Sequence, residues 1–104
     1  MRLLSDYEGR LVRLTQERLV HMSTHPEMVD MEEALEETLA TPDCVITSSS
    51  DPNVHLHYRH LLETPVGDKF LCVVVKVIRD DAFIVTAYLT DKVKQGRILW
   101  PRSR

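Results

Sequence analysis

Residues 69–79, with the sequence KFLCVVVKVIR, carry the most regular apolar pattern of the chain. Apolar side chains recur in this run with a period of two, which is typical of a β-strand. Alternate side chains of a strand point to opposite faces of a sheet, so the run presents two rows. We expect its drier row to face the core and to receive the helices of the domain. This row consists of Leu71, Val73, Val75 and Val77.

Three further candidate strands surround this central run. The loop Thr64–Asp68 precedes it, and Asp80-Asp81 predicts a tight turn directly after it, because Asp tolerates left-handed backbone. Short connections of this kind make neighbouring strands antiparallel. The flanking strands are expected at His55–His60, Ala82–Thr90 and Arg97–Trp100.

The first half of the chain has a helical rather than a two-residue period. Thr15 is a good N-cap for a helix expected at Gln16–Thr24. Pro26 prevents a smooth continuation of that helix and suits the first residue of a second one, which ends at Thr41-Pro42-Asp43. The apolar positions of the second helix are Met28, Met31, Leu35 and Leu39.

These elements predict an α+β fold in which two N-terminal helices pack on one face of a four-stranded antiparallel sheet. A length of 104 residues leaves room for one domain, residues 1–104. Residues 1–9 read as a marginal hairpin or a frayed arm, with turn residues at Asp6-Tyr7-Glu8-Gly9.

Composition and charge argue against a membrane-spanning or secreted protein and show an uneven distribution of charge. No apolar run approaches the roughly 20 residues of a membrane span, and the charged N-terminus does not resemble a secretory signal. Cys44 and Cys72 are isolated, so we expect reduced thiols and a cytoplasmic protein. The net charge is −3, yet residues 26–43 hold seven acids and no Lys or Arg. This asymmetry permits a positive cleft elsewhere.

Polar side chains of the predicted sheet define a candidate site. If each strand turns its more apolar row toward the helices, the other rows meet on one open surface. A slip of one residue in register would reverse the contribution of a strand. The converging residues are His57, Arg59, Lys76, Thr86, Tyr88 and Thr90. A second cluster follows from helical spacing, because Arg18, His21 and His25 lie at i, i+3 and i+7.

Several segments, in their order along the chain, resemble phage-associated nuclease-like domains of the barnase/EndoU/colicin/RelE superfamily. The matching segments are LTQERLVHMSTHPE (14–27), SDPN (50–53), HYR (57–59), VVVK (73–76), VTAYLT (85–90) and KQGRILW (94–100). The resemblance implies a barnase/RelE-like pair of helices on an antiparallel sheet. It also implies a toxin-like or phage-associated ribonuclease that works without a metal or another cofactor.

Such an enzyme uses the 2′-hydroxyl of RNA as its nucleophile, and it needs an acid, a base and cations around the phosphate. His25 or His21 would supply the acid or base because imidazole titrates near neutrality. Arg59 and Lys76 would hold the phosphate, while Thr86 and Tyr88 would position it or donate a proton. The predicted substrate contacts are Arg18, His57 and Thr90.

Two other interpretations stay open. A non-catalytic protein-interaction domain of the same fold would bind an antitoxin or inhibitor, either on the polar face or at the edge strand near Arg97–Trp100. A zinc site is a third interpretation, since His55 and His57, or His21 and His25, have spacings that put both rings on one side. The oligomeric state stays undetermined.

Overall fold

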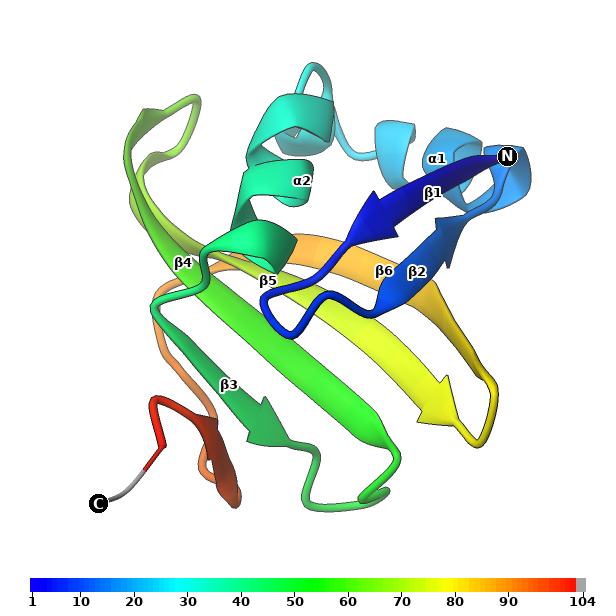
Figure 1. Ribbon diagram of the computed structural model, residues 1–104. Coiled ribbons are helices and arrows are strands. Elements are labelled where there is room, and N and C mark those ends of the chain that lie inside the picture. Colours follow the sequence, from blue (N-terminus) through cyan, green and yellow to red (C-terminus); the bar gives the residue numbers. More distant parts are fainter. Residues whose placement is uncertain (103–104) are drawn as a thin grey trace.

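A computed structural model of the protein describes residues 1–102, and the fold is α+β (Figure 1). One sheet is covered by helices on one side and crossed by a connecting segment on the other. The elements in chain order are β1 (Arg2–Ser5), β2 (Leu11–Leu14), α1 (Gln16–Ser23), the 3₁₀ helix η1 (Pro26–Met28), α2 (Glu32–Ala40), β3 (Cys44–Thr47), β4 (Val54–Thr64), β5 (Gly67–Ile78), β6 (Asp81–Thr90) and β7 (Ile98–Trp100).

The predicted four-stranded antiparallel sheet is wrong. Within residues 1–102 the sheet has seven strands in the order β1-β2-β6-β5-β4-β3-β7, and it is mixed because β2 pairs with β6 in parallel. The chain begins with strands rather than with helices. The sequence prediction also missed β3, whose four residues follow the end of α2 after a short connection and are too few to show a period.

The N-terminal stretch is an ordered hairpin because the turn has its own polar anchor. The backbone N–H groups of Glu8 and Arg10 donate to Asp6 Oδ1 at 2.9 and 2.8 Å, and the Arg10 guanidinium donates to Asp6 Oδ2 at 2.9 Å. The Asp6 side chain is fully buried in this arrangement. Gly9 has φ 81°, a left-handed conformation that glycine adopts without strain. Of the two alternatives for this stretch, the hairpin is confirmed and the frayed arm is wrong, since β1 pairs with β2 along its whole length.

The helices are shorter than the sequence predicted, and the second is interrupted. The Thr15 hydroxyl accepts from Arg18 N as the expected N-cap of α1. Pro26 begins η1, and Asp30, with φ 63°, separates η1 from α2. Within residues 1–102, neither α-helix is long and apolar enough to cross a membrane.

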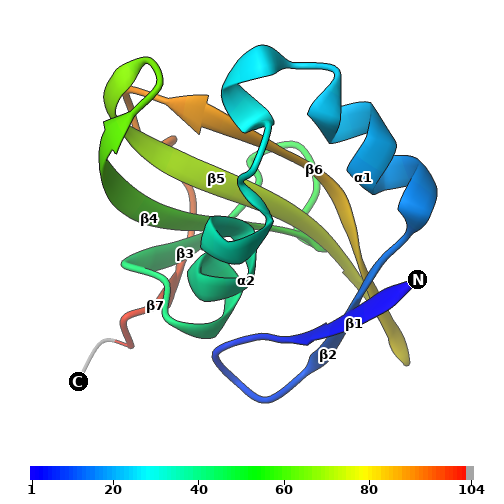
Figure 2. The ribbon, with the colours of Figure 1, turned by 90° about the horizontal axis from the view of Figure 1, so that it is seen from above.

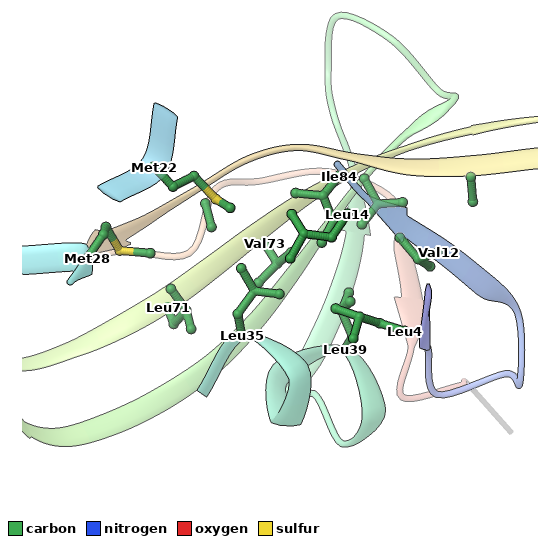
Figure 3. Close-up of a cluster of buried hydrophobic side chains, with 13 residues drawn as sticks. Leu4, Val12, Leu14, Met22, Met28, Leu35, Leu39, Leu71, Val73 and Ile84 are labelled. Carbon is green, nitrogen blue, oxygen red and sulfur yellow. The ribbon is translucent and has the colours of Figure 1, made fainter. Parts of the chain in front are cut away.

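The main core lies between the sheet and its helical layer. Seen from above, α1 and α2 lie over one face of the sheet (Figure 2). Leu71, Val73 and Val75 of β5 are completely buried there and meet Leu35 and Leu39 of α2 (Figure 3). The prediction that this row of β5 faces the helices is therefore confirmed.

A second apolar cluster lies on the other face of the sheet, which we call the outer face. Ile46, Leu56, Tyr58 and Cys72 are buried in it. The segment 91–97 joins β6 to β7 across this side (Figure 1). Lys94 N donates to Tyr58 Oη at 3.2 Å, and Thr47 N donates to Arg97 O at 2.9 Å. The sheet is thus buried on both sides along its middle strands.

Replacing Asp6 tests whether its carboxylate holds the N-terminal hairpin. Asp6→Ala leaves the N–H groups of Glu8 and Arg10 without their partner, and we expect the free energy of unfolding to fall by about 2–3 kcal/mol in urea titrations. Asp80→Ala, at a turn where the carboxylate makes no side-chain hydrogen bond within residues 1–102, is the matched control and should cost under about 0.5 kcal/mol. Equal losses in the two variants would contradict this role.

Gly96 tests the contact between the crossing segment and β3. A Cβ atom at Gly96 would lie 2.2 Å from the backbone oxygen of Thr47. The clash could be relieved only by a shift of the backbone at Gly96 or at Thr47. We expect Gly96→Ala to lower the free energy of unfolding by about 2 kcal/mol or more, as overpacked sites do. Hydrogen exchange at Thr47 N should accelerate, while Gln95→Ala should leave it protected. Unchanged protection in Gly96→Ala would refute the close contact.

Candidate outer-face site

Four of the predicted site residues share the outer face on adjacent strands. Lys76 lies on β5, and Thr86, Tyr88 and Thr90 lie opposite Val74, Cys72 and Phe70 of that strand. Residues paired in this way point to the same side of a sheet. A bulge on β6 between Ile84 and Thr86 keeps the row in phase with β5. All four side chains are half-buried, so each is held in place and still reachable from solvent.

Lys76 is fixed by a carboxylate from the loop between β3 and β4. Its ammonium group donates to Asp51 Oδ2, and Asp51 Oδ1 accepts from Asn53 N at 2.9 Å. Asn53 O in turn accepts from Val77 N at 2.8 Å. The hydrogen bond from Lys76 lowers the pKa of Asp51 below its usual range, so the Asp51 carboxylate is ionised at neutral pH. An anion that approached Lys76 would therefore share this cation with Asp51.

Tyr88 belongs to the same row but is constrained by its neighbours. It packs with the second apolar cluster, close to Cys72 and Tyr58. Burial is the main cause that raises the pKa of Tyr88 above its usual range, and it raises that of Tyr58 to about 12. Burial also raises the pKa of the Cys72 thiol. These groups stay protonated at neutral pH, so Tyr88 can donate a hydrogen bond and is a poor source of a proton.

Arg59 and His57 do not join this row, and the single surface predicted for them is wrong. Arg59 lies opposite Leu71 and His57 opposite Val73, so both point to the helical side of the sheet. The Arg59 guanidinium donates to the Thr41 carbonyl oxygen at 2.5 Å and to its hydroxyl at 3.0 Å. The prediction assumed that only one face of β4 is buried. Because both faces are, the apolar row of Leu56 and Tyr58 faces outward instead.

The three predicted residues of α1 are exposed. Arg18 and His21 lie on the helix, and His25 lies at the start of η1. The His21 and His25 rings have centroids 6.4 Å apart, and His25 Nδ1 lies 4.0 Å from Glu27 Oε1. α1 packs against β6, the strand that carries Thr86, Tyr88 and Thr90. Because this packing is on the helical side of the sheet, the histidines lie on the side opposite the outer-face row.

A second polar cluster was missed because its parts are distant in sequence. The ring of Tyr7, from the first turn, lies 5.9 Å from that of His57 and 5.6 Å from that of Trp100 on β7 (centroid distances). Tyr7 Oη, His55 Nδ1 and His57 Nε2 are buried and have no hydrogen-bond partner within residues 1–102. The spacing of His55 and His57 was the available signal, but nothing in the sequence placed Tyr7 against them. Because these three polar atoms are covered, they are not placed to contact a phosphate.

The histidines of residues 1–102 are not part of a cluster of metal-ligating side chains. Among residues 1–102, no three His, Cys, Asp or Glu side chains come together as a metal site would require. Cys44 and Cys72 both carry free thiols. The paired histidine spacings of the sequence therefore lack a third ligand of these types in the described chain.

Comparison with protein-family models, with curated proteins and with solved structures gives no match. The resemblance of the sequence to the nuclease superfamily accordingly stays a prediction, and the arguments about function rest on the geometry of this chain.

Buried His57 predicts a loss of stability in mild acid. Its Nδ1 donates to Val73 O at 3.3 Å, but burial dominates and lowers its pKa to about 4, while Asp6 and His55 act in opposite directions. As the pH falls below about 6.5, His57 becomes protonated in the unfolded chain but stays neutral in the folded chain. The free energy of unfolding therefore has its full value above pH 6.5 and falls toward pH 4, by up to about 1.4 kcal/mol per pH unit.

Urea unfolding between pH 7 and pH 4.5 checks this slope. His57→Asn should flatten it, whereas His60→Asn, at an exposed position of the same strand, should keep it. Nuclear magnetic resonance of the His57 ring gives an independent readout if His57→Asn folds poorly. A ring that titrates near pH 6.5 in the folded protein would contradict the prediction.

Proposed function

We propose that this protein is a metal-independent ribonuclease of the barnase/EndoU/colicin/RelE type, whose substrate phosphate binds at the outer face of β5 and β6. The observation that carries the proposal is the row of one ammonium group and three hydroxyl groups on this face, Lys76, Thr86, Tyr88 and Thr90. Together these groups offer one positive charge and several hydrogen-bond donors to an anion.

The row fits the charge that develops during cleavage of RNA. Attack of the 2′-hydroxyl on the adjacent phosphate places extra negative charge on the non-bridging oxygens. Lys76 would supply a point charge to those oxygens, and the hydroxyl of Thr86 would donate a hydrogen bond. Thr86 lies opposite Val74, two residues before Lys76 on the same face of β5, so one phosphate group would have to lie between the two side chains. Thr90 lies opposite Phe70, six residues from Lys76 along β5, so it would contact a more distant part of the RNA strand.

His21 and His25 are the proposed proton-transfer groups. Both rings are exposed on the segment of α1 and η1 that packs against β6 from the helical side of the sheet. The proposal therefore requires RNA bound at the outer face to pass around the sheet to reach them. Imidazole can take a proton from the 2′-hydroxyl and return one to the leaving oxygen near neutral pH. Arg59, which the sequence analysis assigned to the phosphate, has no part in this arrangement because it binds Thr41 on the other side.

The distribution of charge supports an approach from the outer face. The acidic run of residues 26–43 belongs to η1, α2 and the residues around them, which cover the opposite side of the sheet. RNA on the outer face is therefore separated from most of this run by the sheet. Asp51, which lies outside this run, is on the outer face, and its pairing with Lys76 would weaken the attraction for phosphate.

A non-catalytic protein-interaction domain is the second candidate, and the observation in its favour is the edge strand β7. Ile98 is 65% exposed and Trp100 is 37% exposed on this short strand. Its only strand partner within residues 1–102 is β3. An extended segment of another protein, such as an antitoxin or inhibitor, could add to this edge by strand pairing.

Cleavage of a mixed-sequence RNA in EDTA, with a DNA strand of the same sequence as control, tests the proposed activity. We expect RNA to be cut and DNA to survive, because DNA lacks the 2′-hydroxyl. Lys76→Ala should lower the rate at least 10-fold and His25→Ala about 100-fold or more. The matched control is Lys69→Ala, which removes a lysine of the same strand that pairs with Asp91 and points to the helical side.

Each alternative result has a definite meaning. If folded protein does not cut RNA, the catalytic proposal fails and the interaction domain replaces it. If Lys69→Ala and Lys76→Ala lose activity equally, cleavage does not occur at the outer-face row. Circular dichroism of each variant separates lost activity from lost folding.

A further inference from the structure

An apolar groove is lined by residues of α1, η1 and α2. These helices cover the face of the sheet opposite the outer face (Figure 2). Its volume is about 590 Å³, and its walls come from α1, η1 and the first turn of α2. Met22 of α1 and Met28 of η1 reach its floor beside Leu35 (Figure 3). Neither the proposed chemistry nor the polar cluster around Tyr7 uses this groove.

The apolar walls of the groove extend to its exposed rim. Val20 is 58% exposed and Val29 is 49% exposed, on opposite walls. Exposure of a valine side chain to water contributes no stability, and these two valines extend the apolar surface of Met22 and Met28 to the rim of the groove. Methionine adapts its shape to a guest because its unbranched side chain has three rotatable bonds. The groove therefore offers a continuous and deformable apolar surface.

The rim of the groove is acidic. Asp30, Glu32 and Glu33 line it, and among residues 1–102 no Lys or Arg does. Glu32 already pairs with Arg2 at 2.9 Å, while Asp30 and Glu33 have no ion-pair partner within residues 1–102. Asp30 is also held at φ 63°, an uncommon conformation for a residue other than glycine, directly between η1 and α2.

We propose that this groove binds a cationic amphipathic helix of a partner protein. Such a helix places an apolar stripe against the methionines and valines and Lys or Arg beside Asp30 and Glu33. The charge of the rim excludes an RNA strand from this site. It also disfavours a second copy of this chain, because α2 would bring four glutamates to an acidic rim. The inference does not depend on the ribonuclease activity.

Two labelled 18-residue helical peptides give the test, one with leucine and lysine faces and one with leucine and glutamate faces. Fluorescence anisotropy with the full chain should give micromolar binding of the lysine peptide and at least 10-fold weaker binding of the glutamate peptide. Binding of the lysine peptide should weaken as salt rises from 50 to 500 mM, because the rim charges are exposed. Equal binding of the two peptides overturns the proposal.

Matched variants locate the binding. Val20→Gln removes an exposed apolar wall of the groove without adding charge, and we expect it to weaken the lysine peptide at least 10-fold. Val66→Gln is the control, since Val66 is similarly exposed (52%) but lies in the turn between β4 and β5. Asp30→Asn with Glu33→Gln should remove the preference for the lysine peptide, whereas Glu17→Gln with Asp80→Asn should keep it.

Two further results decide whether the groove is the binding site and which molecule occupies it. If Val20→Gln and Val66→Gln weaken binding equally, the peptide binds elsewhere and the proposal fails. Sedimentation of the unmodified chain identifies the other occupant. A dimer that Val20→Gln dissociates would mean that the groove binds a second copy, which overturns the proposal of a cationic helix. RNA cleavage is measured separately, so a negative result here leaves that question untouched.

Discussion

The strand β5 carries apolar side chains on both faces, so both sides of the sheet must be covered by other parts of the chain. Leu71, Val73 and Val75 face the helical layer, and Cys72 faces the second apolar cluster. A strand that is buried in this way cannot serve as the floor of an open cleft along its whole length. Its middle is covered on the outer face, because the crossing segment 91–97 meets the sheet near Tyr58 and Thr47, whereas Lys76 near its end is half-buried and reachable from solvent. Burial of β5 thus decides where a polar site can exist.

The same fact explains which parts of the fold the sequence predicted. The period of two in β5 and β6 and the N-cap at Thr15 are local signals, and these elements lie where they were expected. The orientation of β4 is not local. His57 is completely buried on the helical side although Leu56 and Tyr58 are more apolar, since both rows of β4 have a core to enter. The rule that the more apolar row faces the helices fails whenever a sheet has two cores.

The N-terminal hairpin shows a second limit of sequence reasoning. The turn Asp6-Tyr7-Glu8-Gly9 was visible as turn chemistry, but its strength comes from a buried carboxylate that binds two backbone N–H groups and a guanidinium. The turn then carries Tyr7 to His57 and Trp100, and Glu8 to Arg102 at 3.4 Å. These contacts bring the first turn to the last strand. No periodicity in either segment predicts such a contact between the two ends of the chain.

The sheet also separates charges of opposite sign, and this separation makes a two-sided protein physically reasonable. Lys76 and its hydroxyl neighbours lie on the outer face, while Asp30, Glu32 and Glu33 lie at the rim of the groove between the helices. The Debye length at physiological salt is about 8 Å, so charges on the two sides of a sheet with a helical layer affect one another weakly. An acidic total charge is therefore no obstacle to binding an anion on one side. A cationic partner in the groove would neutralise the acidic side without covering Lys76 and its hydroxyl neighbours on the outer face.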